Sequence, residues 1–184
     1  MRELFIDIET SGTDPVKHTI LSIGIVISLN GLEDFQSFYR EVKYNDIVVS
    51  PASIEVNKID LSDQTGRIPL AKVDEESSAF IKKHYNTDFK PMPIGLNIGS
   101  FDMQFINRQM PYFSTKLSSR SVDLNSLIYV YAEKHSEDFT LAKEKLSGIA
   151  IAKTNSLGLG IEKHNALYDA IYSLALYSEI KDII

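Results

Sequence analysis

Cysteine is absent from the 184 residues of the chain. Disulfides and thiolate metal sites are therefore excluded, and any metal must be held by oxygen or imidazole ligands, which favours hard cations. No apolar run approaches the roughly 18 residues that a membrane helix needs. Low-complexity tracts and internal repeats are also missing. We therefore expect a soluble, cytoplasmic globular protein without a membrane partner.

An excess of positive charge is absent as well, because the formal net charge is −6. Proteins that coat nucleic acid usually present a basic face, so this balance argues against a coating protein. It still allows an enzyme that grips only the end of a nucleic-acid strand. The length suits one domain with its own core, and residues 1–184 are predicted to form a single domain.

The order of predicted elements indicates an α/β fold. Three extended segments, residues 4–9, Ile20–Ser28 and Phe35–Val42, lie close enough in sequence to form an antiparallel meander. Further strands are predicted at Met92–Asn97 and Ser119–Leu124. Helical patterns cover Pro51–Lys58 with Ser50 as its cap, Ala71–Tyr85, Ser100–Met110, Asn125–Lys134, about Thr140–Leu146, and His164–Ile180. We expect a mixed sheet, antiparallel and then parallel, with helices on both faces, as in the ribonuclease-H-like architecture and some other mixed folds.

Two carboxylates interrupt the first strand, in the stretch FIDIETSG. Side chains alternate along a strand, so Asp7 and Glu9 share one face with Phe5. Burying an ionised carboxylate without a partner is costly, and two neighbouring ones repel each other. A basic side chain, solvent at a strand edge or a divalent cation must compensate them, and the strand alone does not decide which.

Two more acids and a histidine break apolar patterns later in the chain. Asp102 lies near the start of a predicted helix, where a capping or dipole role is the structural alternative. Asp169 is predicted to lie too far inside its helix for a cap, which leaves a buried ion pair as the alternative. His164, five residues earlier, points about 140° away on a continuous helix. It is therefore expected at the helix entrance, with Asn165 as the cap. Together these residues suggest one site.

The same residues carry a family resemblance. FIDIETSG is similar to the first motif of the DEDD exonucleases, NIGSFD resembles the second, and HNALYDA resembles the third motif of the histidine-containing branch. The three motifs occur in the family's order and span nearly the whole chain. The proofreading, ribonuclease-T-like and oligoribonuclease-like members, all with the ribonuclease-H-like fold, are the most similar.

The resemblance implies a metal-dependent 3′-to-5′ exonuclease that releases nucleoside monophosphates from single-stranded or short DNA or RNA with a free 3′ end. It implies that Asp7, Glu9, Asp102 and Asp169 hold two divalent cations, Mg²⁺ or Mn²⁺, and that His164 is the general base. Metal would then compensate the carboxylates of the first strand. A homodimer is a further possibility that rests on family likeness alone.

Substrate contacts are also carried over from the family. Thr10, Ser11 and Gly12 match a segment that lies against the terminal nucleotide, and Asn57 and Ile59 fall where a loop residue touches the last base. Phe101 is a candidate to stack on a base. The neighbouring Phe105 is expected to pack in the core. Asn97 corresponds to the second motif's asparagine, although it precedes Asp102 by five residues where many members have four.

Two other functions remain open from the sequence. The first is a catalytically silent module that binds nucleic-acid ends or assists a larger assembly. The second is a phosphohydrolase that cleaves mononucleotide esters and leaves oligonucleotides intact. Ser22 stands where proofreading members often have glutamate, so the subfamily is undecided. The choice between DNA and RNA is undecided too, because it depends on a contact to the 2′-hydroxyl.

Overall fold

The computed structural model describes residues 2–86, 88–161 and 163–181. A six-stranded mixed sheet forms its centre, with strand order β4-β3-β2-β1-β5-β6. The strands are β1 (Glu3–Thr10), β2 (Ile20–Asn30), β3 (Asp34–Lys43), β4 (Ile68–Pro69), β5 (Pro93–Gly95) and β6 (Val122–Asp123). The pairs β1–β2 and β2–β3 are antiparallel, whereas β1–β5, β5–β6 and β3–β4 are parallel. The predicted meander and fold class are confirmed.

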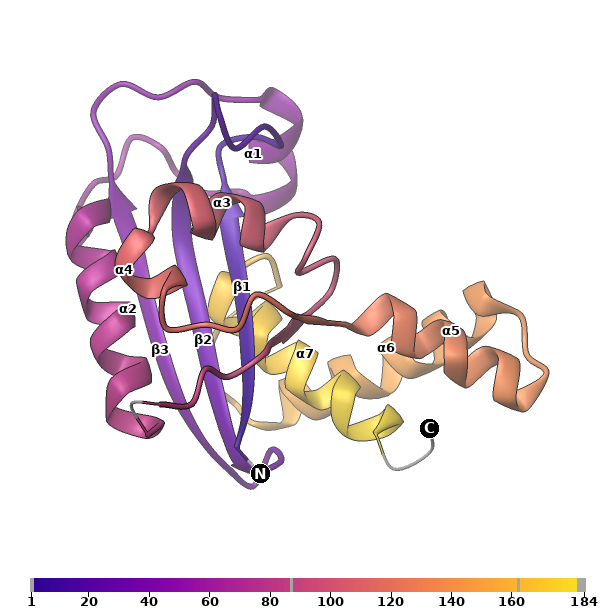
Figure 1. Ribbon diagram of the computed structural model, residues 1–184. Helices are drawn as coiled ribbons and strands as arrows, with labels where there is room; N and C mark the ends of the chain where they lie inside the picture. The colour runs from indigo at the N-terminus through magenta and orange to yellow at the C-terminus, as the bar shows by residue number, and fades with distance from the viewer. Residues whose placement is uncertain (1, 87, 162, 182–184) are drawn as a thin grey trace.

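Helices cover both faces of the sheet (Figure 1). They are α1 (Pro51–Asn57), α2 (Leu70–His84), α3 (Asp102–Gln109), α4 (Pro111–Ser114), α5 (Leu124–His135), α6 (Phe139–Ser156) and α7 (Ala166–Ile180). Residues of α2, α3 and α4 pack on one face, and residues of α5, α6 and α7 pack on the other. The sheet is therefore the middle layer of three, as expected for an α/β domain.

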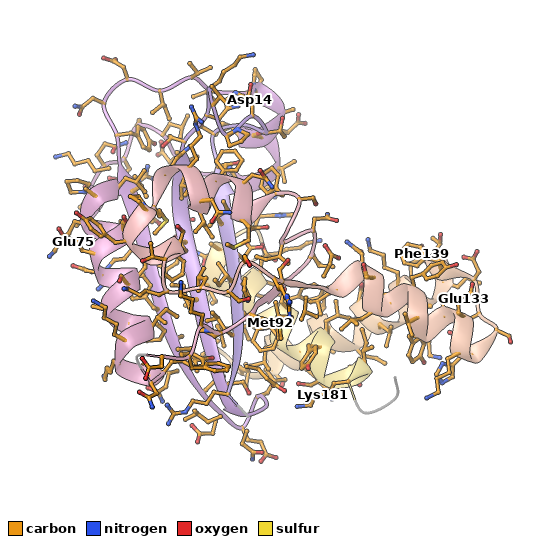
Figure 2. All side chains as sticks on the ribbon, in the orientation of Figure 1. Asp14, Glu75, Met92, Glu133, Phe139 and Lys181 are labelled. Carbon is orange, nitrogen blue, oxygen red and sulfur yellow. The ribbon has the colours of Figure 1, made fainter. Side chains whose placement is uncertain are left out.

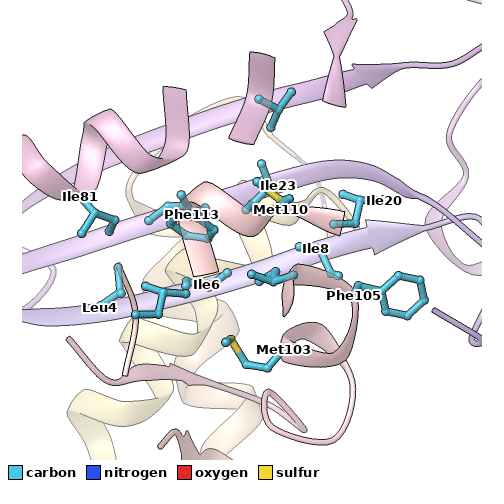
Figure 3. Packing of buried hydrophobic residues seen from close by; sticks show 14 of the residues in the cluster. Leu4, Ile6, Ile8, Ile20, Ile23, Ile81, Met103, Phe105, Met110 and Phe113 are labelled. Atoms are coloured by element: carbon cyan, nitrogen blue, oxygen red, sulfur yellow. The ribbon is translucent and has the colours of Figure 1, made fainter. Parts of the chain in front are cut away.

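The first strand is buried on both faces. Leu4, Ile6 and Ile8 point into the core beneath α3 and α4, where they meet Phe105 and Phe113 (Figure 3). Phe5 points to the opposite core under α7. Phe105 is fully buried, as predicted. Between the two ends of the strand, apolar packing therefore covers both faces.

Helix α6 is longer than the sequence indicated. The pattern suggested about Thr140–Leu146, whereas the helix runs for 18 residues from Phe139 to Ser156. Asp138 caps its first turn, accepting hydrogen bonds from the backbone N–H groups of Thr140 and Leu141. A helix of alanine and lysine residues with little amphipathic pattern is poorly marked by periodicity, which explains the short prediction.

Three other details differ from the predictions. The two-residue strand β4 and the four-residue helix α4 were not expected. Ser50 occupies the predicted cap position of α1, but its side chain makes no capping hydrogen bond. Pro51 at the first helical position suits the helix start without that bond. These are short elements whose existence depends on packing around them.

Helices α5 and α6 extend sideways from the sheet (Figure 1). Figure 2 places Glu133 and Phe139 at the outer end of this pair. Among the described residues, we find no helix with the length and apolar character that crossing a membrane requires.

Candidate active site

The acidic residues of β1 project toward α7. Asp7 pairs with Gly24 of β2 and Glu9 pairs with Ser22, while Ile8 between them faces the opposite core. Both carboxylates are half-buried. Strand alternation thus places two acids on a mostly covered face, as the sequence predicted.

The start of α7 brings a third carboxylate to the same place. Asn165 caps the helix by accepting a hydrogen bond from the Leu167 N–H, which confirms the predicted cap. Asp169 lies in the first turn, and its Oδ2 accepts the His164 N–H at 3.1 Å. Asp169 is the fourth residue of the helix and is not its cap, as expected, although the helix begins at Ala166 and not at His164.

Gly24 allows this helix start to approach the sheet. A Cβ atom at Gly24 would lie 2.2 Å from the backbone oxygen of Ala166, which is far inside van der Waals contact. Any larger residue would therefore push α7 away from β2. As a result of this close packing, carboxylate oxygens of Asp7, Glu9 and Asp169 lie within 4.8 Å of one another.

Asp102 completes the group from the other side. It is the first residue of α3, and its Oδ1 accepts the Ile8 N–H at 3.1 Å. This bond ties the α3 start to β1 beside Asp7 and Glu9. A cavity of about 390 Å³ is lined by all four acids, which we call the four-acid cluster, together with His164, Asn97, Ser100 and Phe101. The structure thus brings together all five predicted catalytic residues.

Electrostatic repulsion within the four-acid cluster is strong. Burial, followed by the charges of Asp169 and Asp102, raises the pKa of Glu9 to about 8. Burial, followed by the other three carboxylates, raises the pKa of Asp7 well above its ordinary value. Within residues 2–86, 88–161 and 163–181, no lysine, arginine or histidine forms an ion pair with any of the four acids. Among the described residues, no ion pair therefore compensates this negative charge.

The other two acids are shifted in the same direction. Burial raises the pKa of Asp102 to about 7, although its hydrogen bond from Ile8 works against the shift. Burial also raises the pKa of Asp169, with the nearby charges of His164 and Lys163 opposing it. Several carboxyls that hold protons near neutral pH in one small cavity are typical of a functional site.

His164 lies just before the cap of α7, at the edge of the cavity. Its backbone is left-handed, with φ of 67°, which is unusual for a residue with a side chain. Its side chain lines the 390 Å³ cavity beside Asp7 and Asp169. The predicted placement of this histidine at the helix entrance is confirmed.

The loop after β1 is held mainly by its own polar groups. The Thr10 hydroxyl donates to the Gly12 oxygen at 2.7 Å. Ser11 is fully buried, and its hydroxyl donates to the Val48 oxygen and accepts the Thr19 N–H. Of the three predicted substrate contacts here, only Thr10 lines a cavity, one of about 480 Å³ beside Glu9. The Ser11 hydroxyl is used in hydrogen bonds that hold the loop in place.

Asn57 and Ile59 are linked to the same loop. Asn57 is buried, donates through Nδ2 to the Thr10 oxygen at 3.0 Å, and accepts the Ile59 N–H at 3.2 Å. It lines the 480 Å³ cavity with Phe101. Ile59 lines a separate hollow that also reaches His164. Asn57 therefore has a clear structural role, the attachment of α1 to the end of β1.

Asn97 shapes the turn that precedes Asp102. Its backbone is left-handed, with φ of 54°, and its oxygen accepts the N–H groups of Ser100 and Phe101. Its side-chain oxygen accepts a hydrogen bond from Asn125 at 3.0 Å. Asparagine tolerates this conformation better than most residues, so Asn97 both lines the cleft and supports the turn.

Sequence reasoning missed the positioning role of Gly24 and the second wall of the cleft, formed by Leu96, Tyr168 and Tyr172. A glycine in the middle of an apolar strand marks a close backbone approach and could have indicated the first. The second depends on how α6 packs on α7, and no local pattern reveals it.

The chain is similar to known 3′-to-5′ exonucleases. Residues 2–181 match the 3'-5' exoribonuclease Rv2179c-like domain. An oligoribonuclease of Colwellia psychrerythraea is 31% identical over 131 residues, covering 67% of this chain and 71% of that protein. The 3'-5' DNA exonuclease Cap18 of Escherichia coli is 27% identical over 188 residues, covering 96% and 90%.

The fold matches solved exonucleases. E. coli exonuclease I in complex with a dT13 oligonucleotide aligns with a TM-score of 0.67 and 18% identity, covering 98% of this chain and 41% of exonuclease I. The chain spans less than two thirds of the length of the solved structures it matches, which include a full-length 3'-exonuclease at 60%. Fold and relatives together define the chain as a 3′-to-5′ exonuclease of ribonuclease-H-like fold. Within that class, it belongs to the Rv2179c-like 3'-5' exoribonuclease domain family.

Proposed function

We propose that the four-acid cluster and His164 are the catalytic centre of an exonuclease of the histidine-containing DEDD branch. The observation that carries this proposal is the convergence of Asp7, Glu9 and Asp169 within 4.8 Å without a basic partner among the described residues. A structural ion pair would include a cation. A purely structural cluster of mutually repelling acids would only reduce stability.

The donor set fits divalent cations. All four acids offer carboxylate oxygens, the ligands that Mg²⁺ and Mn²⁺ prefer, and the chain has no thiol. We propose that Asp7, Glu9, Asp102 and Asp169 hold two such ions. When bound, a pair of divalent ions stabilises negative charge on the attacking and leaving oxygens of an in-line displacement.

The chain's own groups supply the remaining chemistry. His164 is the general base that accepts a proton from the attacking water, a step typically worth about 10²–10⁴-fold. The water oxygen bonds to phosphorus while the bond from phosphorus to the 3′ oxygen of the preceding nucleotide breaks. A nucleoside 5′-monophosphate leaves, and the strand is shortened by one. His164 is placed for this role by the hydrogen bond from its N–H to Asp169.

The substrate that we propose is single-stranded or short nucleic acid with a free 3′ end. The relatives support this class, since they are named as an oligoribonuclease and a DNA exonuclease, and a solved neighbour is bound to an oligonucleotide. The 480 Å³ cavity between Thr10, Asn57 and Phe101 is the proposed site of the terminal nucleotide. The Phe101 ring would stack on its base, an interaction worth about 1–3 kcal/mol.

The proposal is tested with matched 5′-labelled DNA and RNA oligonucleotides, incubated with Mg²⁺ or Mn²⁺ and separated on a sequencing gel. Wild type should produce a ladder that shortens from the 3′ end, and Asp7→Asn should not. Glu144→Gln, an exposed acid on α6, is the matched control and should behave as wild type. An undiminished ladder from Asp7→Asn would place the catalytic centre elsewhere.

A further inference from the structure

A second hollow opens from the catalytic cleft between α6 and α7. It encloses about 370 Å³ and shares Asp7, Leu96, His164 and Asp169 with the 390 Å³ cavity of the cleft. The two cavities therefore adjoin at these four residues. We call this hollow the α6–α7 pocket. Its volume lies within the range of about 300–1,000 Å³ that is typical of ligand pockets.

Fixed aromatic rings form one wall of the α6–α7 pocket. The Tyr172 hydroxyl donates to Ser147 Oγ, and the Tyr168 hydroxyl donates to Asn155 Oδ1, both at 2.9 Å. These bonds hold both rings against α6. Ile151 adds an apolar surface from α6. A wall of this kind suits a flat, partly apolar group such as a nucleobase with its sugar.

Two lysines line the same pocket, Lys143 from α6 and Lys163 from the loop before α7. Neither forms an ion pair with any carboxylate that the structure describes. The Lys143 ammonium lies 5.9 Å from the centre of the Phe139 ring, and the charge of Lys163 acts on Asp169. Cations beside an acidic cleft attract a phosphate group and draw it toward the four-acid cluster. The pocket thus combines what a nucleotide needs, a surface for the base and positive charge for the phosphate.

We infer that the α6–α7 pocket receives the nucleotide on the 5′ side of the scissile phosphodiester. This inference rests on the proposed function, which places the terminal nucleotide in the cavity beside Glu9 and Thr10. The α6–α7 pocket opens from the opposite side of the cleft, where Asp7 and Asp169 lie. A strand with its scissile phosphate at the four acids therefore passes from one cavity into the other.

Two substrates separate this role from a general effect on catalysis. An oligonucleotide occupies both cavities, whereas the p-nitrophenyl ester of thymidine 5′-monophosphate has no nucleotide on the 5′ side. Lys143→Gln should raise KM for the oligonucleotide about fivefold at 0.1 M salt, because one phosphate contact on a single strand contributes a log–log salt slope of about 0.7. In Lys143→Gln, the slope of log KM against log salt concentration should be smaller than in wild type by about 0.7. KM and kcat for the ester should not change.

Ile151→Trp tests the volume of the pocket. The larger ring would fill the space beside Tyr172 and reduce kcat/KM for oligonucleotides by about 10²-fold, because the strand could no longer align. Turnover of the ester should be preserved, which also shows that the variant is folded. Lys145→Gln is the matched control, because Lys145 lies on the same helix but pairs with Glu137 at 3.0 Å.

Equal losses on both substrates, or unchanged oligonucleotide kinetics and salt slope in Lys143→Gln, would overturn the inference. Failure of the proposed function has a different signature. Wild type would then cleave neither substrate in any metal. Wild-type cleavage of both, with no selective effect in Lys143→Gln, would leave the exonuclease intact and reject only the α6–α7 pocket.

Discussion

Two regions of the molecule bury aspartate in opposite ways. Asp74 of α2 is 2% exposed and accepts the backbone N–H groups of Tyr112 and Phe113, at 3.0 and 2.6 Å, so it fixes the start of α4. In the described part of the chain, no group donates a hydrogen bond to the carboxylate of Asp7 or Glu9, which instead face other acids. Burial of an acid is thus not itself a sign of function. The sign is a set of acids that converge on one cavity, of which two, Asp7 and Glu9, receive no hydrogen bond.

The largest expected effect comes from neutralising one acid in each region. Asp7→Asn should lower exonuclease activity about 10⁴-fold, since it removes one of the carboxylates that would hold the proposed ions. It should not lower the melting temperature in EDTA, because it relieves repulsion. Asp74→Asn should do the reverse, costing about 1–3 kcal/mol of stability through two weakened hydrogen bonds while the folded fraction keeps its activity. Activity assays and urea unfolding of both variants would check this contrast. Equal losses of activity and of stability in the two variants would contradict it.

The general base gives the next largest effect. His164→Ala should lower kcat about 10²–10³-fold. Wild-type activity should rise with pH as the imidazole of His164 loses its proton, since only the neutral imidazole accepts a proton. The variant should lose that rise. His135→Ala, at the exposed end of α5, serves as the control. A wild-type profile that stays flat from acid to neutral pH would remove His164 from this role.

Packing beneath the four-acid cluster can be tested with two glycines. Gly24→Ala should cost about 1–3 kcal/mol, because its Cβ would lie 2.2 Å from the Ala166 oxygen. The displaced helix would carry Asp169 with it, so activity should fall about ten- to a hundredfold. Gly148→Ala in α6 meets nothing within 4 Å and should instead stabilise the protein by about 0.5–1 kcal/mol. Thermal melts and kinetics of both variants measure the difference, and a wild-type-like Gly24→Ala would refute the positioning role.

The smallest effect is a dependence of stability on pH in metal-free protein. The pKa of Glu9 is raised to about 8, so from its ordinary value up to about 8 the folded state binds more protons than the unfolded state. The free energy of unfolding in EDTA should therefore fall as pH rises through this window.

Metal should reverse this fall, because divalent ions bind the ionised carboxylates. The rise in melting temperature caused by Mn²⁺ should be larger at about pH 8.5 than at about pH 5.5. Glu9→Gln should flatten both dependences, with Glu144→Gln as the control. A metal-induced rise that is independent of pH would contradict the assignment of these carboxyls as ligands.

Much of the fold could be predicted from local patterns. Apolar alternation located β1 to β3, and turn and cap residues such as Asn165 located the start of α7. Helix α6 was underestimated, because its alanines and lysines give little periodicity and its length is set by packing on α7. Strand β4 and helix α4 depend on contacts that form only after folding, such as the capping of α4 by Asp74.

The site was predictable only in part, for a related reason. Asp7, Glu9, Asp102 and Asp169 each break an apolar pattern, so the sequence identified the residues that converge. The hydrogen bond from the His164 N–H to Asp169 could not be foreseen, because it depends on the left-handed backbone of His164. The α6–α7 pocket was invisible as well, since Lys143 and Tyr172 meet only through the pairing of two helices that are separate in sequence.

The most direct test of the central claim is a crystal of the wild-type protein soaked in Mn²⁺ and measured at the manganese absorption edge. The account predicts two anomalous peaks within the four-acid cluster. A cluster without anomalous density, while Mn²⁺ supports exonuclease activity in solution, would contradict it.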